Sequence, residues 1–214
     1  MIDTNDSEFL SRVEGADLKA KICDAKTAAA MIQPGDILGI SGFTPCGYPK
    51  ITMHELAERM KETPFQVDVW TGASTGSQID SELIAVNGVR VRMPYQTNGN
   101  LRKAINAGAL DYFDLHLSHV AQQIRAGFFT NAKGERVTGP DVAVVEVCKI
   151  GPNGELYTTT AIGNSPVFVD TAKKVIVEVN TTQPLELAGM ADIYMRKNPP
   201  HCEPIPIKTA GDRV

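Results

Sequence analysis

Two glycine-rich turns, each directly after a short apolar run, constrain the fold of this chain more than any other feature. Residues 41–50 (SGFTPCGYPK) follow the run 37–40, and residues 71–78 (TGASTGSQ) follow the run 67–70. Each turn leads into a segment with the apolar spacing of a helix. Strand, glycine turn and helix, in this order, form the ligand-binding edges of open α/β sheets. The turns therefore predict a site built from strand ends, suited to an acyl or phosphate-bearing ligand rather than a metal.

Strand and helix signals alternate along the chain to about residue 180. The β-branched runs 142–147 and 175–179 are the strongest strand signals, and the glycine turn 151–154 predicts a hairpin from the first of them to a strand at 156–160. The other predicted elements are strands over 37–40, 65–70 and 89–93, a helix over 25–32 capped by Asp24, and helices after Pro49, around 79–84, over 101–110 and over 118–126.

This alternation predicts an α/β domain with a mostly parallel sheet flanked by helices. In a parallel sheet every strand directs its carboxyl end to the same edge. The segments that follow the predicted strands should therefore converge there, together with a third glycine-bearing segment late in the chain. These segments are residues 41–42, 72–76, 96–98 and 163–165.

Composition excludes several classes of partner. The 214 residues suffice for one large domain, and a net charge of −4 with a pI near 5.6 gives no basic surface for nucleic acid. No apolar run approaches the roughly 20 residues of a membrane span, and the acidic amino terminus does not resemble a signal peptide. The four cysteines form no CxxC pair, which favours reduced thiols in the cytoplasm.

Other interpretations of the turns stay open at this point. Residues 71–76 resemble the glycine turn of short-chain dehydrogenases, but Gln78 stands where the third glycine is needed, and no Tyr-x-x-x-Lys pair occurs. A tight turn without any ligand is an alternative. Cys46 lacks an evident base that would make it a nucleophile, and His116 with His119 lacks a third metal ligand. We therefore expect no metal.

Two glutamates interrupt apolar strands. A carboxylate on a buried strand is either paired or functional. Glu146 is predicted equally well as a structural partner or as a group that faces the site, whereas Glu178 is predicted to be mainly structural.

The turns also carry a resemblance to a known family. The motifs 41–50, 71–78, INAG with YFD at 105–108 and 112–114, GNS at 163–165 and VIVEVN at 175–180 occur in an order that resembles the amino-terminal half of the acetyl-CoA hydrolase/transferase family. This family includes succinyl-CoA:acetate and propionyl-CoA:succinate CoA-transferases. The resemblance runs from about Lys21 to the end of the chain, and it implies a CoA-transferase-type fold.

The resemblance also implies a chemistry and a set of substrate-binding residues. A glutamate attacks the acyl-CoA thioester, and an acyl-glutamyl anhydride and then a glutamyl-CoA thioester carry the activated group. That glutamate lies in the second half of the family's polypeptide, so no catalytic residue is expected here. Coenzyme A is a substrate, and no cofactor is implied. The implied substrate-binding residues are Ser74, Thr75, Thr97, Gly42 and Phe43.

The expected organisation is an extension over 1–20, an α/β domain over 21–195, and a proline-rich tail over 196–214 that leads to a missing carboxyl-terminal domain. The expected partners are an acyl-CoA, a small carboxylate such as acetate, succinate or propionate, that missing domain, and a second copy in a homodimer. Hydrolysis of acetyl-CoA is an alternative outcome. A stand-alone ligand-binding or interaction domain and a site like that of sugar-phosphate isomerases also stay open, although no cluster of Lys and Arg lies beside the glycines.

Overall fold

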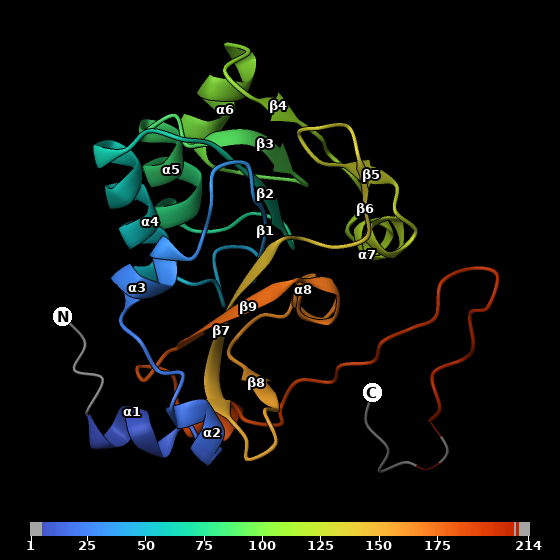
Figure 1. Ribbon diagram of the computed structural model, residues 1–214. Helices are drawn as coiled ribbons and strands as arrows, with labels where there is room; N and C mark the ends of the chain where they lie inside the picture. Colours follow the sequence, from blue (N-terminus) through green and yellow to red (C-terminus); the bar gives the residue numbers. More distant parts are fainter. Residues whose placement is uncertain (1–5, 208, 210–214) are drawn as a thin grey trace.

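A seven-stranded, mostly parallel sheet forms the centre of the computed structural model, which describes residues 6–207 and 209 (Figure 1). The strands run in the order β4-β3-β2-β1-β7-β8, and β9 pairs with β7. All neighbours are parallel except β7 and β8. Their bounds are β1 Ile37–Ile40, β2 Val67–Thr71, β3 Val89–Met93, β4 Asp111–Tyr112, β7 Val142–Ile150, β8 Leu156–Thr158 and β9 Lys174–Val179. The predicted fold class is confirmed.

Helices cover both faces of this sheet (Figure 1). One face carries α3 Ala25–Ala30, α4 Ile51–Glu62, the π-helix η1 Gln78–Glu82 and α5 Leu83–Ala85, and the other carries α7 Leu117–Arg125 and α8 Ser165–Thr171. The remaining elements are α1 Ser7–Ser11, α2 Ala16–Lys19, α6 Gly99–Asn106, the 3-10 helix η2 Leu185–Leu187, and a separate hairpin of β5 Phe129–Thr130 and β6 Arg136–Val137.

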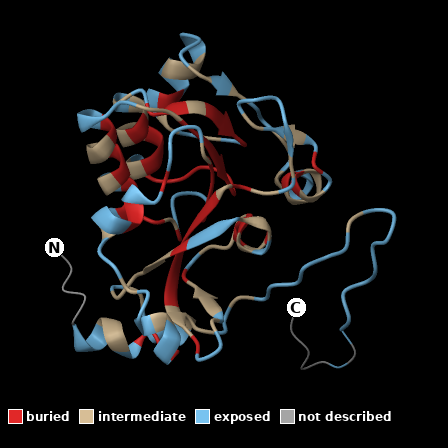
Figure 2. Cartoon of the chain, in the orientation of Figure 1, coloured by how far each residue is buried: buried red, intermediate tan, exposed pale blue. Residues whose placement is uncertain are grey.

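Burial follows the predicted helix and strand patterns. Strand β7 is buried from Val142 to Cys148, as expected for a parallel strand covered on both faces, and the central strands form the buried core in Figure 2. Met53, Leu56 and Met60 recur at helical spacing on α4 and are fully buried against the sheet. On the opposite face, α7 and α8 pack against Trp70 of β2, and Phe168 of α8 belongs to the same buried cluster.

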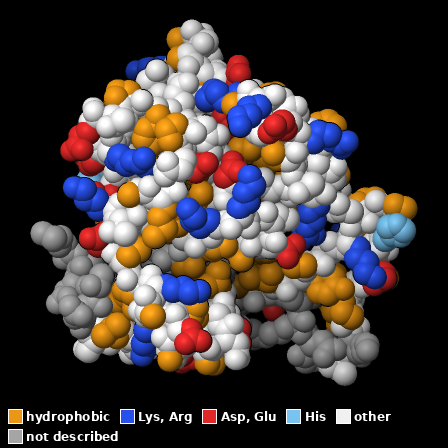
Figure 3. All heavy atoms as spheres, viewed as in Figure 1, with side chains coloured by type: hydrophobic (Ala, Val, Ile, Leu, Met, Phe, Trp, Pro, Cys, Tyr) orange, Lys and Arg blue, Asp and Glu red, His pale blue; other side chains and the backbone are white. Residues whose placement is uncertain are grey.

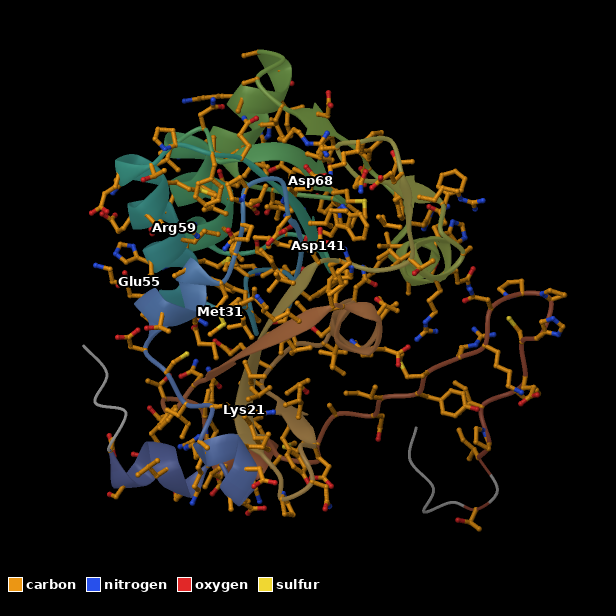
Figure 4. All side chains as sticks on the ribbon, viewed as in Figure 1. Lys21, Met31, Glu55, Arg59, Asp68 and Asp141 are labelled. Carbon is orange, nitrogen blue, oxygen red and sulfur yellow. The ribbon has the colours of Figure 1, made fainter. Side chains whose placement is uncertain are left out.

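Helix α4 receives its amino-terminal cap from β9. The carboxylate of Glu178 accepts hydrogen bonds from the backbone N–H groups of Lys50, Ile51 and Thr52, at 2.6, 3.2 and 2.8 Å. A carboxylate is favourable at this end of a helix because the first N–H groups have no partner within the helix. Glu178 is therefore structural, as predicted. Arg59, labelled in Figure 4, joins the same helix to α3 by donating to the carbonyls of Ala29 and Ile32.

Within the predicted extension, residues 6–20 contain two short helices and contact the sheet. Arg12 is buried, and its guanidinium donates to the carbonyls of Cys148, Thr181 and Gln183. Val13 forms a parallel bridge with Ile150 at the end of β7. Arg12 therefore fixes the point at which the chain leaves β9. No helix or strand follows Leu187 among the described residues, and positions 208 and 210–214 of the predicted tail lie outside them.

Short elements account for most differences from the predicted pattern. The two-residue strands β4, β5 and β6, the helices α1 and α2, and η2 were not predicted, because such short segments have too few residues to show a period. The helix predicted around 79–84 begins as a π-helix. The strand predicted over 65–70 starts at Val67 and includes Thr71.

A buried carboxylate on β2 should make stability depend on pH. Asp68 is only 2% exposed and pairs with Arg90, and Asp141 lies close enough to oppose its ionisation (Figure 4). Burial raises the pKa of Asp68 to about 6 from 3.8, and Arg90 offsets this only in part. Between these two values the folded chain keeps a proton that the unfolded chain has released. This contribution to stability is therefore complete below the lower value and is lost as pH rises through about 6.

Replacing Asp68 by Asn should remove that pH dependence. We expect the unfolding free energy of Asp68→Asn to decline less than that of the wild type between pH 4 and pH 7, measured by urea denaturation at four pH values. Parallel curves for the two proteins would show that Asp68 ionises normally in the folded state.

Candidate functional site

Three glycine-bearing segments meet at the carboxyl edge of the sheet. A β-carbon added at Gly72, after β2, would lie 2.5 Å from the carbonyl oxygen of Gly42, after β1, and 2.7 Å from the α-carbon of Gly163, before α8. The side-chain amide of Asn164 donates through Nδ2 to the carbonyl of Thr71 at 3.1 Å. The predicted convergence is therefore confirmed for residues 41–42, 72–76 and 163–165, three of the four predicted segments, and it depends on backbone contact that only glycine allows.

Tyr48 of the first turn packs against the second turn. Its ring lies so close to Gly76 that a β-carbon there would be 1.9 Å from the ring carbon Cζ. Its hydroxyl donates to Oε1 of Gln78 at 3.1 Å. Gln78, which stands where the dehydrogenase pattern has its third glycine, therefore helps to join the two turns. The ammonium of Lys50 lies 4.3 Å from the centre of the Tyr48 ring.

Glu146 forms a hydrogen-bond network beneath the first turn. Its carboxylate is buried and accepts hydrogen bonds from Lys50 Nζ at 2.5 Å, Thr159 Oγ1 at 2.7 Å and Asn180 Nδ2 at 3.0 Å. These partners satisfy both oxygens and supply the compensating charge that a buried carboxylate needs. Of the two predicted roles for Glu146, the geometry supports that of a structural partner.

A buried ion pair that the sequence analysis did not identify holds the second turn from inside. Arg92 and Asp80 each have side chains only 1% exposed, and Nε of Arg92 donates to Oδ1 of Asp80 at 2.9 Å. Arg92 also donates to Thr71 Oγ1 at 2.9 Å and to the carbonyl of Ala73 at 3.2 Å. An arginine on an apolar strand was the available signal, but its partner lies twelve residues away in a different element.

Ser74 and Thr75 differ in how their hydroxyls are used. The side chain of Thr75 donates to Asp80 Oδ2 at 3.0 Å, and its backbone N–H donates to the same oxygen at 3.3 Å. The hydroxyl of Ser74 is buried and has no hydrogen-bond partner. Ser74 is only 1% exposed, because residues 41–50 and 161–165 close around its turn at the sheet edge.

The other predicted substrate-binding residues are distributed around this centre. Gly42 lies against Thr75, whose Cγ2 would be 3.4 Å from an added β-carbon, and Phe43 beside it is 43% exposed. Thr97 is exposed on a separate loop, where its carbonyl accepts a hydrogen bond from Arg102. In the part of the chain that the structure describes, no hydrogen bond joins Thr97 to the glycine turns. The structure thus brings together Gly42, Ser74 and Thr75.

Neither the cysteines nor the histidines add a reactive centre to this edge. Cys46 is an exposed free thiol in a tight turn, where its N–H and carbonyl exchange hydrogen bonds with Phe43 at 3.2 and 3.0 Å. The rings of His116 and His119 lie against each other with centres 5.5 Å apart and planes tilted by 51°. Within residues 6–207 and 209, no three His, Cys, Asp or Glu side chains are placed to hold a metal ion. Over the same residues, no helix is long and apolar enough to cross a membrane.

The close approach at Gly72 predicts a large cost for one added methyl group. In Gly72→Ala the new β-carbon would meet two backbone segments that cannot rotate away, so we expect a loss of about 1–3 kcal/mol or more in unfolding free energy. Gly99→Ala is the matched control, because nothing lies within 4 Å of its added β-carbon. Urea denaturation measures both, and equal small effects would contradict the tight contact of the three segments.

Comparison with known proteins gives relatives along nearly the whole chain. Residues 9–209 match the family described as the acetyl-CoA hydrolase/transferase N-terminal domain. The chain is 45% identical over 205 residues to the succinyl-CoA:acetate CoA-transferase of Clostridium kluyveri, covering 95% of this chain and 37% of that protein. It is 40% identical over 195 residues to the propanoyl-CoA:succinate CoA transferase of Escherichia coli, covering 89% and 38%. It is 33% identical over 209 residues to the acetyl-CoA hydrolase of Schizosaccharomyces pombe, covering 95% and 40%.

Solved structures agree on the fold. Glutaconate coenzyme A-transferase from Acidaminococcus fermentans superposes with a TM-score of 0.54 at 15% identity, covering 78% of this chain and 68% of that chain. A variant of the decarboxylase AibA/AibB gives a TM-score of 0.57 at 18% identity, covering 73% of each chain. The chain spans less than half the length of the curated relatives named above. It belongs to the acetyl-CoA hydrolase/transferase family, and it contains that family's N-terminal domain.

Proposed function

We propose that this chain forms one wall of an active site that transfers coenzyme A between an acyl-CoA and a small carboxylate. One observation carries the proposal: the hydroxyl of Ser74 is buried and unpaired inside a turn whose neighbouring polar groups are hydrogen-bonded. A buried hydroxyl without a partner is costly, so it indicates a ligand that completes its hydrogen bond. A carboxylate or a thioester oxygen accepts such a bond.

The turns suit a reaction in which negative charge develops on an acyl oxygen. A donor that is already held in place stabilises that charge without reorganising during the reaction. Glycines at 42, 72 and 163 let the three backbone segments close on one another, which holds in place the turn that carries this donor. We assign Ser74 to this donor role, Thr75 and Gly42 to the shape of the turn, and Phe43 and Thr97 to more distant contacts with substrate.

The attacking carboxylate is proposed to come from outside these 214 residues. Glu146 is bound to Lys50, and Glu178 caps α4, so each carboxylate has a structural use. A missing glutamate would attack the thioester carbon and expel the CoA thiolate. The resulting anhydride would be opened by that thiolate to give glutamyl-CoA and the first free carboxylate. The acceptor carboxylate would then reverse both steps, so no external reactant is consumed.

The relatives favour transfer over hydrolysis. Identity is 45% and 40% to two CoA-transferases and 33% to an acetyl-CoA hydrolase. We therefore propose acetate, succinate or propionate as the acceptor class. A sugar-phosphate site is disfavoured, because the cations nearest the turns, Lys50 and Arg92, are already paired with Glu146 and Asp80. A stand-alone binding domain stays the competing proposal, and a transfer assay separates the two.

The proposed enzyme needs further partners. We propose that a carboxyl-terminal domain closes the site and that the protein is a cytoplasmic homodimer. In support, hydrophobic side chains gather in a hollow between α8 and β8 (Figure 3), lined by residues such as Val147, Leu156 and Val169. The tail beside it exposes Ile193 and Met195, and apolar surface of this kind is typical of contacts with other proteins. The cysteines are free thiols, as a reducing compartment keeps them.

The isolated chain should be catalytically silent. Incubated with acetyl-CoA and labelled succinate, the 214-residue chain should form no succinyl-CoA above the buffer rate, whereas the complete polypeptide should form it readily. Turnover by the isolated chain would mean that one of its own carboxylates serves as the nucleophile, and Glu146→Gln would then be the first variant to test.

Removing the Ser74 hydroxyl should separate activity from stability. In the complete polypeptide, Ser74→Ala should lower transfer roughly tenfold to a thousandfold, the range for one positioned donor. Stability should stay the same or rise slightly, because the hydroxyl lost was buried without a partner. The control Val69→Ala, within the core, should lose roughly 1–3 kcal/mol with little change in rate per folded molecule. Unchanged kinetic constants in Ser74→Ala would exclude this turn from the site.

A further inference from the structure

The side chain of Arg92, from the neighbouring strand β3, lies inside the second turn and binds its polar groups. Arg92 extends from β3, and each nitrogen of its guanidinium has a partner. Nε and Nη2 donate to the two oxygens of Asp80 at 2.9 and 3.3 Å, and Nη2 also donates to the carbonyl of Ala73 at 3.2 Å. Nη1 donates to Thr71 Oγ1 at 2.9 Å and to its own neighbour Met93 at 2.7 Å. The planar fork of arginine matches this set of acceptors, and the single ammonium of lysine does not.

Asp80 completes the arrangement from the other side of the turn. It lies in the π-helix η1, and its Oδ2 accepts both the N–H and the hydroxyl of Thr75. Single π-turns are frequent at functional sites. The pair therefore holds Ala73 through its carbonyl and Thr75 through its N–H. Ser74 lies between these two fixed residues, and its buried hydroxyl has no partner.

We infer that Asp80 and Arg92 are positioning residues that fix the direction of the Ser74 hydroxyl. This inference rests on the proposed function for its kinetic consequence, but its structural consequence can be measured without activity. Because the two side chains are buried and act through Ser74, they contact no substrate. A donor displaced by about 1 Å can cost roughly a hundredfold in rate, so the pair matters to transfer without taking part in it.

The same strand supplies a matched control. Arg90 also pairs with a buried aspartate, Asp68, but at the opposite end of β3 from the turn. If replacing an arginine that pairs with a buried aspartate is enough to change the exchange and kinetics, both Arg90→Lys and Arg92→Lys will show the change. An effect of positioning Ser74 would appear only in Arg92→Lys.

The first experiment measures amide hydrogen exchange by NMR on the 214-residue chain. Arg92→Lys should exchange the Thr75 amide at least about tenfold faster than the wild type, because its acceptor Asp80 loses its fixed position. Arg90→Lys should leave the Thr75 rate unchanged, and the Ile40 amide within β1 reports the stability of the sheet in both variants. Unchanged exchange at Thr75 in Arg92→Lys would overturn the inference.

The second experiment measures kinetics in the complete polypeptide. Arg92→Lys should lower kcat about tenfold to a hundredfold with little change in KM, and Arg90→Lys should lower it less than about twofold. The double variant Ser74→Ala with Arg92→Lys should lose no more than about twofold beyond Ser74→Ala alone, because residues that act through one group are not additive. Full additivity would overturn the inference.

Two further outcomes separate this inference from the proposed function. If Ser74→Ala loses activity while Arg92→Lys keeps wild-type kcat, the positioning role is wrong and the proposed function stands. If Ser74→Ala keeps full activity, the donor role of Ser74 in the proposed site is wrong although the complete polypeptide transfers CoA, and exchange at Thr75 decides the positioning role alone. Should Arg92→Lys fail to fold, the apolar pair Asp80→Leu with Arg92→Met replaces it in both experiments, since such swaps of buried ion pairs often preserve folding.

Discussion

The site depends on the contact of three backbone segments that no side chain separates. The backbones of Gly42 and Gly163 lie so close to Gly72 that no β-carbon fits there. Gly42 follows β1, Gly72 follows β2 and Gly163 precedes α8, and all three lie at the same edge of the sheet. The parallel strands bring the segments to the same edge, and glycine lets them close. Once they have closed, the polar groups between them must be paired with one another or with a ligand.

Almost every polar group near this contact is paired within the chain. Glu146 holds Lys50 below the first turn, and Asp80 with Arg92 holds the second turn from inside. Tyr48 joins the two turns through Gln78. These interactions leave the Ser74 hydroxyl without a partner beside neighbours, Ala73 and Thr75, whose polar groups are hydrogen-bonded. The proposed role in CoA transfer follows from that imbalance, because a fixed donor in a closed turn is what an acyl oxygen with developing charge requires.

The long, regular elements could be predicted from the sequence because their signals are local. Strand β3 was predicted with its observed bounds, since alternation over Val89–Met93 is complete within five residues. The convergence of the glycine turns followed from strand direction alone. The partners of Arg12, Glu146 and Arg92 could not be predicted, because each lies outside the residue's own helix or strand and is brought near by packing. Ser74 was predicted as a binding residue, but its burial was not predicted, because burial of a turn depends on neighbouring turns that the local sequence does not describe.

The most direct test of the central claim is a crystal structure of the complete polypeptide with a bound acyl-CoA. We predict that Oγ of Ser74 lies about 2.7–3.1 Å from the carbonyl oxygen of the thioester, with the three glycine segments still in contact. An acyl group bound away from residues 71–76, or a Ser74 hydroxyl satisfied by another protein group, would contradict it.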